Sequence, residues 1–95
     1  MEKYLPRNIE KEVFFYRTSN GAEADFVVRI NRNIFAVECK ASYSPVLTKG
    51  NYLAFEDIAP KRTFIVIPPG PSIQSWPLKS GIDVLPLPDL KKALG

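Results

Sequence analysis

The chain has 95 residues, of which 45% are apolar and 24% charged, with a formal net charge of +3. A chain of this size and composition builds one small folded domain around a single core. No apolar run approaches the roughly 20 residues that a membrane-spanning helix needs, and no secretory signal is recognisable, so we expect a cytoplasmic protein without a membrane partner. The chain has one cysteine and no histidine. Histidine-based zinc sites, Ser-His-Asp triads and internal disulfides are therefore excluded within it.

The first half of the chain has the pattern of a β-meander. Residues 1–11 are polar and contain Pro6, which predicts a tail or a truncated helix ahead of a single domain over residues 12–95. Three segments rich in aromatic and β-branched residues follow and predict strands at residues 12–18, 23–30 and 34–40. Short polar turns join them, one of which contains Asn20-Gly21. Strands joined by such short turns run antiparallel to their neighbours.

The second half combines helical and extended patterns. Residues 46–58 carry apolar side chains near helical spacing and are followed by Pro60, which predicts a helix. Residues 63–67 are β-branched and apolar, and the succession strand, helix, strand predicts that this strand lies parallel to the third. Two short edge strands and a terminal helix are predicted at residues 73–78, 82–87 and 88–94. We expect an α/β fold with a mixed sheet of four or five strands and one main helix.

Three charged residues lie on strands that are otherwise apolar. Glu38 and Lys40 share one face of the third predicted strand, and Asp25 lies on the second. If strand pairing sets Asp25 opposite Glu38, their Cβ atoms come within about 5 Å, close enough for both carboxylates to bind one divalent cation. Unpaired charges are costly to bury on such strands, which favours a paired or metal-bound site. A shift of one residue in the pairing would place Asp25 on the other face.

Asp25 and the Glu38-x-Lys40 triplet resemble the D…E-x-K core of the PD-(D/E)XK nuclease superfamily. More narrowly, the segments FYRTSNGAEADFVV, AVECKAS and TFIVIPPG resemble a domain of unknown function that follows the ATPase module of prokaryotic AAA-type ATPases. The resemblance extends over most of the chain and implies a reduced restriction-endonuclease-like core. It also implies that Asp25 and Glu38 bind Mg²⁺ or Mn²⁺, and that Lys40 orients the attacking water or stabilises charge on the phosphate.

The chain departs from these relatives in two ways. The superfamily usually supplies a further glutamate from a helix ahead of the first strand, where this chain offers only residues 1–11. The phosphate-binding motif G-x-x-x-x-G-K-[ST] is also absent, so ATP hydrolysis belongs elsewhere. Three functions stay open: a nuclease-like accessory module that binds nucleic acid or couples to an ATPase, a magnesium-dependent nuclease that cleaves DNA, and an oligomerisation domain whose exposed sheet edges pair between chains.

Other residues carry expectations of their own. The cations expected to contact DNA are Arg17, Lys61 and Arg62. Cys39 is expected to be a buried apolar residue, because it shares a strand face with other apolar side chains. The aromatic side chains of the first strand and the helix are expected to fill the core, with stacking on bases as the alternative; these are Phe14, Phe15, Tyr16 and Phe55.

Overall fold

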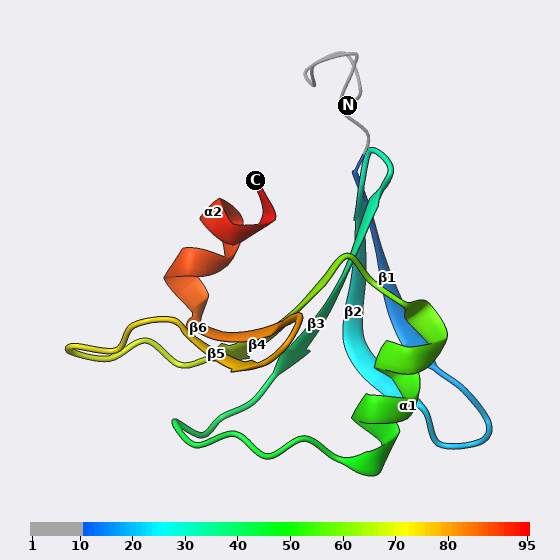
Figure 1. The fold of residues 1–95 in the computed structure, drawn as a ribbon, viewed down its shortest axis with the longest axis horizontal. Coiled ribbons are helices and arrows are strands. Elements are labelled where there is room, and N and C mark those ends of the chain that lie inside the picture. The colour runs from blue at the N-terminus through cyan, green and yellow to red at the C-terminus, as the bar shows by residue number, and fades with distance from the viewer. Residues whose placement is uncertain (1–10) are drawn as a thin grey trace.

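The computed structural model describes residues 11–95, and the predicted tail or truncated helix at residues 1–10 lies outside them. Six strands form one sheet in the order β1-β2-β3-β4-β6-β5 (Figure 1). Their bounds are Lys11–Arg17 for β1, Glu23–Ile30 for β2, Asn33–Cys39 for β3, Arg62–Ile67 for β4, Trp76–Lys79 for β5 and Ile82–Pro86 for β6. The helices are α1 (Lys49–Ile58), a 3-10 turn η2 (Leu87–Asp89) and α2 (Leu90–Leu94).

The predicted strand directions are confirmed. β1, β2 and β3 form an antiparallel meander, and α1 connects β3 to the parallel strand β4. The predicted number of strands was too low, and β6 is not the edge strand expected for residues 82–87. It pairs in parallel with β4 on one side and antiparallel with β5 on the other. Ile82, Val84 and Leu85 are buried because neighbouring strands cover both sides of β6.

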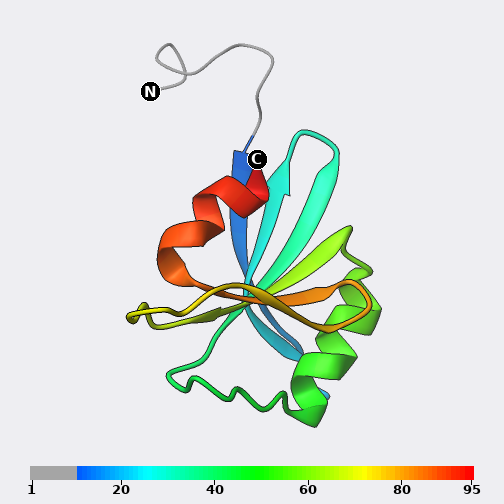
Figure 2. The ribbon, with the colours of Figure 1, turned by 60° about the vertical axis from the view of Figure 1, so that its left-hand side comes forward.

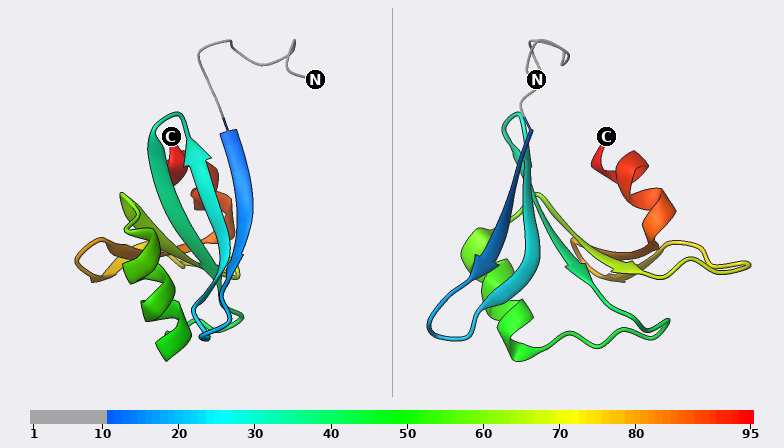
Figure 3. Two further views of the ribbon diagram at one scale, coloured as in Figure 1. Left: turned by 90° about the vertical axis from the view of Figure 1, so that its right-hand side faces the viewer. Right: turned by 180° about the vertical axis from the view of Figure 1, so that it is seen from behind.

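The two helices pack on opposite faces of a strongly twisted sheet. In Figure 1, β5 and β6 run roughly horizontally, whereas β1 and β2 run roughly vertically. Figures 2 and 3 show that the strands lie between α1 and α2. The larger buried cluster lies under α1 and comprises Ala22, Ala24, Ala36, Ala54, Phe55, Ile65, Ile67, Ile82 and Val84. A smaller cluster under α2 comprises Phe35, Phe64 and Leu85. No helix within residues 11–95 is long and apolar enough to cross a membrane.

The N-terminus of α1 is tied to the β1–β2 connection. The Thr48 hydroxyl accepts a hydrogen bond from the Asn51 backbone N–H, and the Thr48 backbone N–H donates one to Asn51 Oδ1, so the helix starts at Lys49 rather than at residue 46. The Asn51 side chain also donates to the Glu23 carbonyl at 3.0 Å. Gly50 lies against the Gly21 carbonyl so closely that a Cβ atom would collide with it. Gly50 weakens the isolated helix, but it permits this close approach.

Candidate functional site at the β2–β3 junction

Asp25 and Glu38 lie side by side where β2 and β3 separate. The register pairs Phe26 with Val37, and one further step places Asp25 opposite Glu38. The Asp25 backbone N–H donates to Glu38 Oε1 at 2.9 Å, and the Cys39 backbone N–H donates to Asp25 Oδ2 at 2.8 Å. Each carboxylate therefore accepts a hydrogen bond from the backbone of the opposite strand. At this point the side chains take the place of backbone carbonyls between the two strands.

A β-bulge changes the direction of side chains in β2. Phe14 pairs with Val27 and Tyr16 with Ala24, so Asp25 and Phe26 both stand opposite Phe15. Ala24 and Val27 are consequently the two buried positions, although they are three residues apart. Strict alternation along β2 would place Asp25 and Val27 on one face, and the bulge breaks this alternation. Bulges commonly redirect a side chain next to a functional site.

Glu38 is held by Lys40 as well as by the backbone. The Lys40 Nζ atom lies 3.3 Å from Glu38 Oε2, and the exposed fractions of the two side chains are 20% and 8%. Burial of a carboxylate to this extent is costly unless its oxygens have hydrogen-bond or ion-pair partners. Here Oε1 accepts the Asp25 amide and Oε2 contacts the ammonium. Both Glu38 oxygens thus have partners within the chain.

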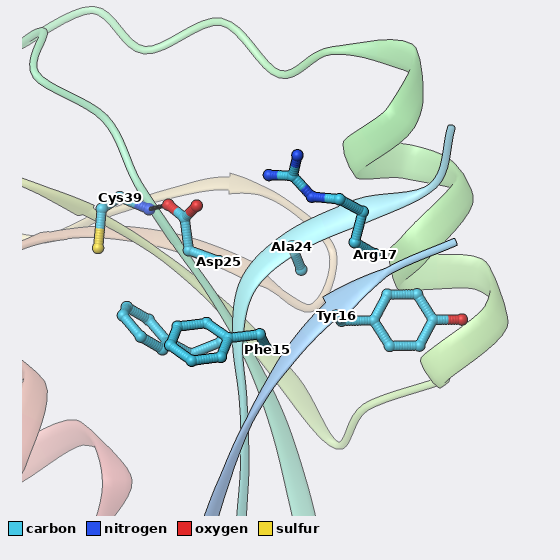
Figure 4. A pocket seen from close by; sticks show the side chains of 7 residues that line it. Phe15, Tyr16, Arg17, Ala24, Asp25 and Cys39 are labelled. Atoms are coloured by element: carbon cyan, nitrogen blue, oxygen red, sulfur yellow. Dashed lines mark hydrogen bonds between the residues drawn. The ribbon is translucent and has the colours of Figure 1, made fainter. Parts of the chain in front are cut away.

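A hollow of about 400 Å³ lies beside Asp25 (Figure 4). The lining side chains include Phe15, Phe26 and Arg17, and the two phenylalanine rings lie 5.7 Å apart between centroids. Tyr16 also lines the hollow, and its ring extends toward α1, where its hydroxyl donates to Asp57 at 3.3 Å. Sequence reasoning missed this hollow because it depends on the bulge. The neighbouring aromatic residues of the first strand were the one signal for it.

Two of the aromatic side chains expected in the core are exposed. Phe55 is buried under α1 as predicted, and Tyr16 is partly buried against the same cluster. Phe15, in contrast, is 85% exposed and Phe14 is 48% exposed. The prediction that these two fill the core is wrong, because β1 is the edge of the sheet and has a neighbouring strand on one side only within residues 11–95.

Cys39 is exposed, which contradicts the prediction of a buried cysteine. It is the last residue of β3 and lines the hollow, so the strand end gives it little cover. Partial burial raises the pKa of its thiol, and the nearby negative charges of Asp25 and then Glu38 raise that pKa further. The thiol is therefore mainly protonated near neutral pH. An environment that disfavours the thiolate does not suit a nucleophile.

The three cations expected to contact DNA do not lie together. Arg17 ends β1 at the same end of the sheet as Asp25, lines the hollow, and has a side chain that is 79% exposed, 3.8 Å from Glu23. Arg62 begins β4 and pairs with Phe35 near the start of β3, which places it at the opposite end. Its guanidinium forms an ion pair with Asp83. Lys61 precedes it at that same distant end.

The carboxylate oxygens of Asp25 and Glu38 are of the kind that binds hard cations such as Mg²⁺, but the site offers few of them. Carboxylates suit Mg²⁺ and Mn²⁺, and Mg²⁺ commonly uses only one or two of them together with water and phosphate. Asp25 Oδ1 accepts no hydrogen bond from residues 11–95, whereas the Glu38 oxygens are already engaged. Within the same residues, no cluster of three or more acidic, cysteine or histidine side chains could hold a metal ion.

These features define a mixed α/β domain with an acidic pair and a lysine where the antiparallel strands β2 and β3 separate. Residues 1–90 match the model of a domain of unknown function, DUF4143, and the chain belongs to this family. Comparisons with curated proteins and with solved structures found no match. The family match includes every residue of the junction, from Arg17 to Lys40.

Proposed function

We propose that this domain is a nuclease-like accessory module that either binds nucleic acid or itself couples to an AAA-type ATPase. In this proposal Asp25, Glu38 and Lys40 are the remnant of a divalent-metal site in a reduced restriction-endonuclease-like core. One observation carries the choice of a binding module over an enzyme: Glu38 is already paired with the Asp25 amide and with Lys40. The resemblance to domains that follow an ATPase module supports the coupling role.

Phosphodiester cleavage places demands on these groups that the pairing opposes. A catalytic lysine must direct its charge to the phosphate or to the attacking water. Here the Lys40 ammonium lies against Glu38, with little of either side chain exposed. A cation that approached Glu38 would compete with that ammonium. Asp25 lines the open hollow and has an oxygen, Oδ1, that accepts no hydrogen bond from the part of the chain that the structure describes.

The residues at this site would give a bound metal ion a limited role. Asp25, with Glu38 behind it, would hold Mg²⁺ or Mn²⁺, which when bound would screen phosphate oxygens and lower the pKa of a coordinated water. Arg17, at the same end of the sheet, would contact the phosphate backbone through its exposed guanidinium. The Arg17 contact would attach the domain to nucleic acid without cutting it, and this attachment would not require the metal.

The second candidate is a magnesium-dependent nuclease that cleaves DNA. The hollow beside Asp25 favours it, because it provides space for a phosphodiester next to the available Asp25 oxygen. In that case Lys40 would have to leave Glu38 in the complex. The two candidates differ in one outcome: the nuclease loses cleavage when Lys40 is changed, whereas the binding module cleaves nothing.

Calorimetric titration with Mn²⁺ and a plasmid-cleavage assay with Mg²⁺ test the proposal together. The variants are Asp25→Asn and Lys40→Ala, with Glu56→Gln on the exposed surface of α1 as a matched control. We expect weak Mn²⁺ binding that is lost in Asp25→Asn and retained in Glu56→Gln, and no cleavage by any variant. Absence of Mn²⁺ binding to the wild type would overturn the metal remnant. Cleavage that disappears in Lys40→Ala would overturn the binding module and establish the nuclease.

A further inference from the structure

Within residues 11–95, the two edges of the sheet differ in how well they are protected against further strand pairing. β5 is four residues long and carries Pro77 and Lys79, two features that discourage another strand from adding to an edge. β1 is seven residues long and contains no proline. Its central residues, VFFY, lie between Glu12 and Arg17 and carry no charge. Such a segment on an open edge readily accepts a further strand.

Apolar side chains of β1 are exposed on both faces of the sheet. Val13 is 63% exposed, and Phe14 and Phe15, which follow it on alternate faces, are also exposed. A ligand in the hollow would cover Phe15 but not Phe14. A strand added alongside β1 would contact all three side chains, because its own side chains alternate in the same way.

We propose that a second copy of this chain pairs with β1 in antiparallel orientation and joins the two sheets into one. The sequence of β1 is complementary to itself when the pairing is centred on Phe15. Phe14 then stands opposite Tyr16 of the second copy, and Val13 opposite Arg17. Aromatic cross-strand pairs of this kind stabilise a sheet. A pairing centred on Phe14 would instead set Lys11 opposite Arg17, which like charges disfavour.

This pairing would connect assembly with the acidic junction. Phe15 lines the hollow beside Asp25, and in the dimer it lies next to the Phe15 side chain of the second copy. The two hollows therefore adjoin across the two-fold axis. The inference rests on the edge strand alone and does not depend on nucleic-acid binding, so either can fail without the other.

Molecular mass measured over a range of concentrations tests the pairing. We expect the wild type to form a dimer whose dissociation constant rises at least about tenfold in Val13→Lys, because this substitution sets a lysine opposite Arg17 in both halves of the interface. Leu78→Lys, on the protected edge strand β5, is the matched control and should leave the dimer unchanged. A wild type that stays monomeric at all concentrations would overturn the proposal.

Cysteine cross-linking tests the register in a Cys39→Ser background. Directly opposed residues have Cα atoms about 4.5 to 5.5 Å apart, within the range that a disulfide spans. We expect Phe15→Cys to form covalent dimers on oxidation. Val13→Cys should not, since the two copies of residue 13 would be offset by four residues, about 13 Å. Cross-linking at residue 13 but not at residue 15 would overturn the register, and cross-linking at neither would overturn the pairing.

Discussion

Asp25 and Glu38 each accept a hydrogen bond from a backbone amide of the other's strand, at N···O distances of 2.8 and 2.9 Å. These bonds fix both carboxylates at the point where β2 and β3 diverge. The acidic pair is therefore part of the sheet as well as a candidate ligand site. Substitutions there are expected to change stability and binding together, so each needs a control that separates the two effects.

Replacing Glu38 tests its structural role. Glu38→Ala leaves the Asp25 amide and the Lys40 ammonium without their partner, and we expect the free energy of unfolding to fall by about 1 to 3 kcal/mol. Glu38→Gln keeps a carbonyl oxygen for the amide and should cost less. Urea denaturation of both variants measures the difference. Equal losses would show that the amide hydrogen bond contributes nothing measurable.

Alkylation of Cys39 reports on the charge of the junction. Partial burial and then the carboxylates of Asp25 and Glu38 raise the pKa of this thiol, so its reaction with iodoacetamide should reach half-maximal rate above the ordinary value of about 8.5. Asp25→Asn removes one negative charge and should shift the profile to lower pH. The exposed control Glu56→Gln should leave it in place. A profile that does not move in Asp25→Asn would contradict the described geometry.

Gly50 provides a test of packing against helix propensity. Alanine is favoured over glycine by about 0.5 to 1 kcal/mol inside a helix, so propensity alone predicts a more stable protein. We expect the opposite from Gly50→Ala, because the added Cβ collides with the Gly21 carbonyl. The net loss should be about 1 kcal/mol or more, as for other overpacked sites. Thermal or urea unfolding that shows increased stability would contradict the close approach of α1 to the β1–β2 connection.

Two exposed cations at opposite ends of the sheet locate the nucleic-acid footprint. Loss of one phosphate contact lowers the slope of log affinity against log salt by about one. We expect this change for Arg17→Ala, measured by fluorescence anisotropy with a duplex, because Arg17 lines the hollow beside Asp25. Lys61→Ala removes a cation at the distant end and should leave the slope unchanged. The reverse result would place the footprint at Lys61 and Arg62.

The strands and their directions could be predicted because local signals agree with the fold. Aromatic and β-branched residues mark β1, β2 and β3, and the short turns between them fix the meander. A helix of the length of α1 between β3 and β4 similarly indicates that β4 lies parallel to β3, as the structure has it. The pairing of Asp25 with Glu38 stayed conditional on the register of these strands, because a shift of one residue would have separated the two carboxylates; the structure sets them opposite each other.

The rest of the site depends on contacts that the local pattern does not encode. The bulge at Asp25 and Phe26 needs the partner strand β1, so strict alternation along β2 does not give the directions of the side chains there. Phe14 and Phe15 have the composition of core residues and are exposed because β1 is an edge. β6 was wrongly predicted to be an edge strand. After β4 the chain first forms the edge strand β5, and β6 then pairs between β4 and β5, an order that the sequence of β6 alone does not indicate.

The most direct test of the proposed function is DNA binding by the wild type and by Asp25→Asn, measured by anisotropy in EDTA at two salt concentrations. A phosphate-binding module should lose at least about tenfold in affinity between 50 and 200 mM salt. Asp25→Asn should bind as tightly as the wild type or more tightly, because it removes a negative charge beside Arg17. No binding at either salt concentration, or binding that appears only with Mg²⁺ and is lost in Asp25→Asn, would contradict the account.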